Sequence, residues 1–169
     1  MKEQTIHRMF LNRIAEGGDA VRYLVPSGGT WEPMTYREVG DAVREIAGGL
    51  MSLGLAKGEK VAILSSTRVE WTLSDIACIL CGFVTVPIYP SNLPDQVEYI
   101  LSHSGARAAF VEDEPQWNKV AGARGRLPGL GAVILLTGSP EGKEGTMGLA
   151  QLRARGAETL AERPGALEA

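Results

Sequence analysis

The sequence has little of several features that would assign a function at once. It contains two cysteines in 169 residues, too few for a disulfide framework. Its formal charge of −3 gives no basic excess of the kind that marks nucleic-acid-binding proteins, so no nucleic-acid partner is expected. The longest apolar run, from Ile76 to Val86, is shorter than the roughly 20 residues that a membrane-spanning helix needs. The N-terminus lacks the apolar segment of a secretory signal, and we therefore expect a cytoplasmic protein.

What remains is the composition of an ordinary globular domain, with 44% hydrophobic and 22% charged residues. Residues 5–16 carry apolar side chains at helical spacing and predict an amphipathic helix. Two extended runs, 21–25 and 30–34, flank a Pro-Ser-Gly-Gly sequence, which indicates a small hairpin. Thr35 and Glu38 then fit a capping box, in which a hydroxyl and a carboxylate satisfy free backbone donors, and predict the start of a second helix.

Four short apolar runs follow at regular distances along the chain. They begin near residues 61, 84, 107 and 132, and helical patterns lie between them. This spacing corresponds to one strand plus one helix with its turns. Continuous apolar strands that alternate with helices are typical of a parallel sheet that is buried on both faces. We therefore predict an α/β fold, a parallel sheet with helices on both faces, preceded by the hairpin.

The same pattern divides the chain into two parts. Residues 1–137 are expected to form an α/β subdomain, with the hairpin near 21–34 and the parallel unit over 61–136. Residues 138–169 are expected to form a loop, rich in glycine and charge up to residue 148, and then a weak helical tail. The last residues, 163–169, are predicted to fray.

Cys78 and Cys81 form a C-x-x-C pattern, which would suit a redox or metal site. Reactive pairs of this type lie at a helix N-terminus, where the dipole stabilises a thiolate. Here both cysteines fall in the last turn before Gly82, where the dipole acts in the opposite direction, and no second pair completes a zinc site. We interpret them as buried apolar residues.

Two segments match phosphate-binding turns only in part. Residues 138–143 have one residue too few between their glycines for a P-loop, and their proline removes an amide donor, so a solvated turn is the stronger interpretation. Ser65, Ser66 and Thr67 lie at a strand-to-helix junction and could present amides to an anion, but no glycine allows close approach. We interpret them as a helix cap, with Thr67 and Glu70 forming a second capping box.

The other candidates are polar or aromatic side chains. His7 and His103 are far apart in sequence and have no metal-ligand spacing. The acidic residues 112–114 end a predicted strand at the carboxyl edge of the sheet, where ligands bind in such folds. We favour a solvated acidic turn there, with metal binding as the alternative. Three aromatic residues could line an apolar ligand channel, although core packing is the stronger interpretation of each: Trp71, Tyr89 and Trp117.

Several stretches, in order and at natural distances, resemble the adenylate-forming (AMP-binding) superfamily, closest to long-chain fatty acyl-CoA synthetases. Residues 35–39, TYREV, resemble the first core motif of that family, and residues 82–91, GFVTVPIYPS, resemble the second in its long-chain form. Further similar stretches are residues 54–63, 70–71, 96–101 and 104–107.

The resemblance implies that the chain is an incomplete N-terminal subdomain of a long-chain fatty acid–CoA ligase. In that family a fatty carboxylate attacks the α-phosphate of ATP to form an acyl-adenylate, and coenzyme A then displaces AMP. ATP, Mg²⁺, coenzyme A and a fatty acid are thus implied for the full-length enzyme, for which peripheral membrane association is an option. The family handles phosphate charge with a Ser/Thr/Gly-rich loop ending in lysine and with a mobile C-terminal domain that carries a catalytic lysine.

Those motifs do not occur in these 169 residues. The resemblance therefore transfers no catalytic, cofactor-binding or metal-binding residue, and we expect the fragment alone to be inactive and to bind no cofactor. By analogy only, Trp71 and Tyr89 are candidates for the wall of the acyl channel. Because a truncated sheet leaves a strand edge uncovered, we also expect the isolated chain to self-associate.

Other interpretations stay open. The chain could come from a fatty acyl-AMP ligase or a carrier-protein adenylation domain, which share this architecture. From another class, it could be a free-standing, non-catalytic α/β module that acts by association. A small flavodoxin-like nucleotide-binding protein would need a phosphate-binding turn after the first parallel strand, for which Ser65 to Thr67 is a poor candidate.

Overall fold

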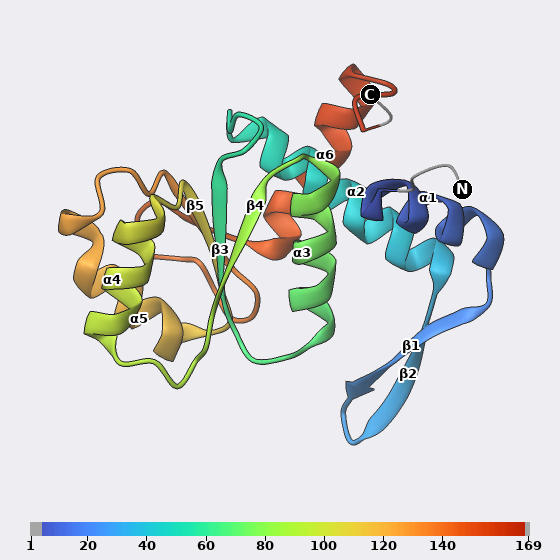
Figure 1. Cartoon of the computed structure of the whole chain (residues 1–169). Coiled ribbons are helices and arrows are strands. Elements are labelled where there is room, and N and C mark those ends of the chain that lie inside the picture. Colours follow the sequence, from blue (N-terminus) through green and yellow to red (C-terminus); the bar gives the residue numbers. More distant parts are fainter. Residues whose placement is uncertain (1–4, 168–169) are drawn as a thin grey trace.

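A computed structural model describes residues 5–167 and shows a parallel sheet between two layers of helices, joined to a hairpin (Figure 1). A short 3₁₀ turn, Arg124–Arg126, follows the fifth helix. The other elements in chain order are α1 (Ile6–Gly17), β1 (Val21–Ser27), β2 (Thr30–Thr35), α2 (Tyr36–Ser52), β3 (Lys60–Leu64), α3 (Val69–Leu80), β4 (Val84–Ile88), α4 (Pro94–Ser104), β5 (Ala108–Val111), α5 (Glu114–Ala123), β6 (Ala132–Leu135), β7 (Thr146–Gly148) and α6 (Leu149–Glu162).

The main sheet has the strand order β4-β3-β5-β6-β7, and all its pairs are parallel. The chain runs from β3 outward to β4 and then crosses back to β5 on the other side of β3. Strand order therefore reverses between β3 and β5, where Leu64 lies opposite Val111. The predicted α/β fold class, with its parallel sheet and preceding hairpin, is confirmed.

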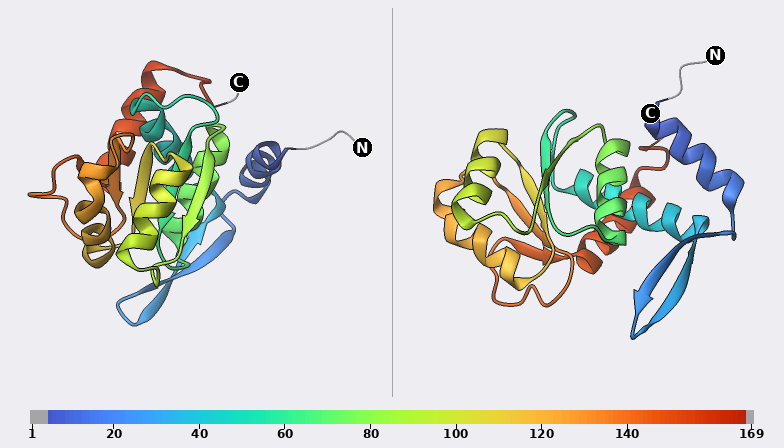
Figure 2. Two further views of the ribbon diagram at one scale, coloured as in Figure 1. Left: turned by 60° about the vertical axis from the view of Figure 1, so that its left-hand side comes forward. Right: turned by 60° about the horizontal axis from the view of Figure 1, so that its bottom comes forward.

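Helices α2, α3 and α6 cover one face of this sheet, and α4 and α5 cover the other (Figures 1 and 2). Strand side chains alternate between the two layers. Ile63, Phe110 and Ile134 enter the core under α2, whereas their neighbours point to the opposite core. Because both faces are buried, every second residue of a strand can be apolar on either side, which explains the continuous apolar runs in the sequence.

One of the two predicted capping boxes is present. Thr35 accepts a hydrogen bond from the Glu38 amide at 3.2 Å, and the Glu38 carboxylate accepts one from the Thr35 amide at 2.7 Å. The box predicted at Thr67 is wrong: α3 begins after Arg68, which has no side-chain cap. The Glu70 carboxylate instead binds the guanidinium of Arg68, a charged donor that competes with the backbone amide.

The segment after residue 137 is more ordered than its pattern indicated. Thr146–Gly148 pairs with β6, so the loop predicted through residue 148 is wrong at its end. Leu152 of α6 is fully buried, and Leu167 is 4% exposed, so the predicted fraying is wrong there, while residues 168–169 lie outside the described part. The predicted boundary after residue 137 stays a prediction, although β7 and α6 pack on the same sheet.

Candidate functional site

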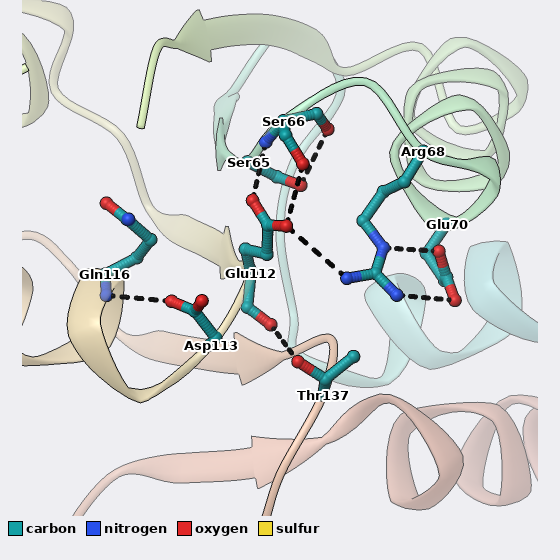
Figure 3. Close-up of polar contacts among 8 residues, drawn as sticks. All are labelled: Ser65, Ser66, Arg68, Glu70, Glu112, Asp113, Gln116 and Thr137. Carbon is teal, nitrogen blue, oxygen red and sulfur yellow. Dashed lines mark hydrogen bonds and ion pairs between the residues drawn. The ribbon is translucent and has the colours of Figure 1, made fainter. Parts of the chain in front are cut away.

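The reversal of strand order brings the carboxyl ends of β3 and β5 side by side. In open parallel sheets this switch point is the usual place for a ligand. Ser65 and Ser66 follow β3, and Glu112 follows β5, so the sequence folds two of its candidate segments against each other (Figure 3). We call Ser66, Arg68, Glu70 and Glu112 the switch-point cluster.

Glu112 is the centre of this cluster. Its carboxylate accepts hydrogen bonds from the Ser66 amide and from the Ser66 hydroxyl, both at 2.7 Å. The guanidinium of Arg68 lies 3.5 Å from the same carboxylate and donates to Glu70 at 2.6 and 3.1 Å. The Glu112 backbone carbonyl accepts from the Thr137 hydroxyl at 2.7 Å, which ties the end of β6 to the cluster (Figure 3).

The cluster holds Glu112 in its charged form. Its side chain is 18% exposed, and this burial opposes ionisation. The hydrogen bonds from Ser66, together with the charge of Arg68, outweigh burial and lower the pKa of Glu112 below its ordinary value. The hydrogen bonds to Glu70 raise the pKa of Arg68, so the guanidinium beside Glu112 remains charged.

This geometry decides what the switch point can bind. The amide and hydroxyl of Ser66, which could have received a phosphate oxygen, already bind a carboxylate of the same chain. An external anion would have to displace Glu112 against charge repulsion. The interpretation of Ser65 to Thr67 as a helix cap is wrong, because α3 begins after Arg68 and Ser66 binds Glu112 instead.

The acidic residues 112 and 113 have separate roles in the structure. Within the described part of the chain, no group of three or more His, Cys, Asp or Glu side chains could hold a metal ion. Asp113 caps α5 by accepting from the Gln116 amide at 3.1 Å. The expected solvated turn is wrong for Glu112, because a contact with Ser66, 46 residues away in sequence, largely buries it.

The cysteine pair lies where the sequence predicted. Cys78 is fully buried in the last turn of α3, and Cys81 is half-buried at the end of that helix, with its thiol 3.4 Å from the Ala47 carbonyl. Both thiols are free. Burial raises the pKa of both thiols, that of Cys81 to about 12. The interpretation as a buried apolar residue is confirmed for Cys78, whereas Cys81 packs on the same core but is only partly buried.

We predict that both thiols resist alkylation in the native protein. At pH 8 a thiol with a pKa of about 12 has roughly a thousandfold less thiolate than an ordinary cysteine. Iodoacetamide should therefore label neither Cys78 nor Cys81 within an hour, whereas both should react once the protein is unfolded in guanidinium chloride. Mass spectrometry of the intact protein measures this, and rapid native labelling would contradict it.

The two candidates for a channel wall have different surroundings. Trp71, on α3, is partly buried against the core under α2. Tyr89 follows β4 and is 77% exposed, so the core packing expected for it is wrong. Trp117, the third aromatic candidate, donates from its indole to the Thr146 hydroxyl at 2.9 Å, and the ammonium of Lys143 lies 5.2 Å from its ring centre. Lys143 is 13% exposed, so the solvated turn predicted for residues 138–143 is wrong for this side chain.

A hollow of about 600 Å³ lies between the hairpin and helices α2, α3 and α6. Apolar side chains from the hairpin and from α3 form part of its wall. Five carboxylates also line it, together with one arginine, which makes it unsuited to an apolar chain: Glu32, Glu38, Asp41, Glu45 and Glu70, with Arg153. Neither Trp71 nor Tyr89 lines this hollow.

Comparisons with known proteins all indicate the same enzyme family. The sequence pattern of the AMP-binding enzyme family matches residues 12–164. Long-chain-fatty-acid–CoA ligase FadD15 of Mycobacterium bovis is 38% identical over 121 residues, which are 72% of this chain and 20% of that protein. Long-chain-fatty-acid–CoA ligase ACSBG2 of Xenopus laevis is 31% identical over 130 residues, 77% of this chain and 18% of that protein. The chain thus spans about a fifth of the length of these relatives.

Solved structures share the fold. The anthranilate CoA ligase AuaEII, crystallised with anthranoyl-AMP, superposes with a TM-score of 0.79 at 23% identity over 88% of this chain and 27% of its own. The adenylation domain of a carboxylate reductase from Mycobacterium chelonae also gives a TM-score of 0.79, at 18% identity, over 94% of this chain and 30% of its own. At these identities the likeness concerns the fold alone.

Proposed function

The chain belongs to the AMP-binding enzyme family, and from this membership we propose that it is the N-terminal part of a long-chain fatty acid–CoA ligase. The observation that carries the proposal is the 38% identity to a long-chain-fatty-acid–CoA ligase over most of this chain. The full-length enzyme then activates a fatty acid with ATP, releases pyrophosphate and transfers the acyl group from the adenylate to coenzyme A.

Residues 5–167 serve this reaction as framework. At the switch point the donors of Ser66 are taken by Glu112, and the described part holds no group of three or more His, Cys, Asp or Glu side chains that could bind a metal ion. The residues at hand do not fit a magnesium–nucleotide site, and we assign no step of adenylation to them. ATP, Mg²⁺ and coenzyme A are proposed ligands of the parts of the enzyme beyond this chain.

The assignments of domain boundary, location, channel wall and self-association are also proposals. We propose residues 1–137 as the N-terminal subdomain and a cytoplasmic location with peripheral membrane association as an option. None of the helices between residues 5 and 167 has the length and hydrophobicity of a membrane span.

Tyr89 is the better candidate for the channel wall, because its exposed ring is available to a ligand, whereas Trp71 already packs on the core. Self-association of the isolated chain through edge strand β4 also remains a proposal.

ATP–pyrophosphate exchange tests the function. The full reading frame of the gene is expected to exchange labelled pyrophosphate into ATP only when a long-chain fatty acid is present. The 169-residue chain is expected to stay at background with and without fatty acid, because it offers no cradle for phosphate charge. Exchange by the isolated chain would contradict the proposal, as would a full-length protein that is inactive with every fatty acid tried.

The product separates the related alternatives. Formation of an acyl thioester with coenzyme A supports the ligase. Accumulation of acyl-adenylate in the presence of coenzyme A points to a fatty acyl-AMP ligase, and transfer to a carrier protein points to an adenylation domain. A reading frame that ends at Ala169 favours the non-catalytic association module.

A further inference from the structure

The hairpin of β1 and β2 carries an apolar face that nothing in the described chain covers. Cross-strand partners lie on the same face of a hairpin, and the register pairs Leu24 with Pro33 and Pro26 with Trp31. All four residues are exposed, Leu24 by 61% and Trp31 by 65%. Figures 1 and 2 show the hairpin projecting away from the main sheet. We call these four side chains the hairpin face.

The two prolines show which part of the hairpin is adapted for contact. Gly28 and Gly29 form a two-residue turn with positive φ angles of 53° and 85°, so Ser27 and Thr30 form the hydrogen-bonded pair next to it. By alternation, Pro26 and Pro33 occupy non-hydrogen-bonded positions, where a backbone N–H would point outward from the strand edge.

Each outer edge of the hairpin therefore lacks a donor that a further strand would need. Proline on an edge is a device against strand addition. An isolated two-stranded hairpin is also marginally stable in water, so an exposed apolar face on it needs cover. The hairpin is built to be packed on its face and to resist extension of its edges.

The size of the face indicates what covers it. A stable interface between separate proteins takes about 20 to 30 residues from each side, and four side chains fall far short of that. A segment linked to the same polypeptide acts at an effective concentration in the millimolar range, so it can dock on a much smaller surface. The hairpin face carries no charge, and its partner must therefore be apolar.

We propose that the hairpin face is the docking surface for an apolar segment of the parent enzyme that follows residue 169. The proposal rests on the proposed function, since about four-fifths of the length of the relatives lies outside the matched region. The docked segment packs face to face on Leu24 and Trp31 and leaves both strand edges unpaired. It holds the hairpin, and with it the start of α2, against the rest of the enzyme.

Cysteine labelling tests this without relying on activity. Leu24→Cys and Trp31→Cys are placed separately in the 169-residue chain and in the product of the full reading frame. Maleimide should react rapidly with both variants of the short chain. In the full-length protein the rate should fall by about tenfold or more, because reactivity follows exposure. The unmodified proteins supply the slow background of Cys78 and Cys81.

Tyr99→Cys is the matched control, since Tyr99 is 66% exposed on α4, far from the hairpin. Its rate should agree within about twofold between the two proteins. If the full-length Leu24→Cys and Trp31→Cys variants label as fast as their short counterparts, the inference is overturned, even if the protein is an active ligase. Equal protection of the Tyr99→Cys variant, or protection that requires lipid vesicles, would also overturn it. Protection of the short chain that grows with its concentration would assign the face to a second copy instead.

Discussion

Replacement of Gly156 with valine is expected to lower the free energy of unfolding by about 3 kcal/mol, the upper range for overpacking a core. Helices α2 and α6 cross at Gly48, Gly49 and Gly156 with their backbones in contact. A Cβ atom at Gly156 would overlap the carbonyl oxygen of Glu45 and lie 2.6 Å from the Gly49 amide nitrogen. These are backbone atoms, which cannot rotate away, so the two helices must move apart. Urea unfolding followed by circular dichroism measures the loss.

A glycine without such neighbours is the control. Gly122 lies in α5, and a Cβ atom there would meet nothing within 4 Å. Gly122→Ala should raise the free energy of unfolding by about 0.5 to 1 kcal/mol, because alanine restricts the unfolded chain and favours the helix. If Gly156→Val were as stable as the parent sequence, the close helix crossing would be disproved.

Glu112→Ala is expected to cost about 2 kcal/mol of stability, because it removes the acceptor of two Ser66 donors and one of the two carboxylates beside the Arg68 guanidinium. Arg68 keeps its hydrogen bonds to Glu70 and water can reach the exposed Ser66, so the loss is smaller than for a buried charge left unpaired. The loop after β3 should also loosen, which faster amide hydrogen exchange at Ser66 would report. Glu144→Ala, at an exposed position, serves as control and should change stability by less than about 0.5 kcal/mol.

The same carboxylate predicts a pH dependence. The pKa of Glu112 is lowered in the folded protein, so its contribution to stability is complete above the ordinary glutamate pKa and is lost as the pH falls through the lowered value. Glu112→Gln removes this titration while keeping the shape of the side chain. The thermal midpoint of the variant should fall less steeply than that of the parent sequence between about pH 5 and pH 3. Identical pH profiles would show that Glu112 is not charged at this site.

Local patterns in the sequence were a reliable guide to the helices and to four strands of the sheet. The capping box at Thr35 and the positive φ of 66° at Gly105, which ends α4, depend on neighbours within one turn. The C-x-x-C interpretation also held, because the position of Cys78 and Cys81 relative to the end of α3 is itself local. β7 was missed, since three residues, Thr-Met-Gly, are too few to show any periodicity.

The switch-point cluster could not be assembled from the sequence. Ser66 and Glu112 each had an interpretation of their own, a cap and a solvated turn, and both were wrong for one reason. The residues are 46 positions apart, and only the reversal of strand order between β3 and β5 brings them together. No local sequence pattern indicates that the Glu112 carboxylate occupies the position at the switch point where a ligand would bind.

By itself, the sequence determined the alternation of strands and helices, the parallel sheet and the family, because these are expressed in periodicity and in short motifs. Only the tertiary structure decided that Glu112 fills the switch point, that Gly156 lets α6 lie on α2, and that the hairpin presents a bare apolar face. Each of these depends on groups that meet across the fold, such as Arg153 and Glu45, 108 residues apart. Burial, charge and close approach act through space, and the order of residues along the chain does not state which of them will be neighbours.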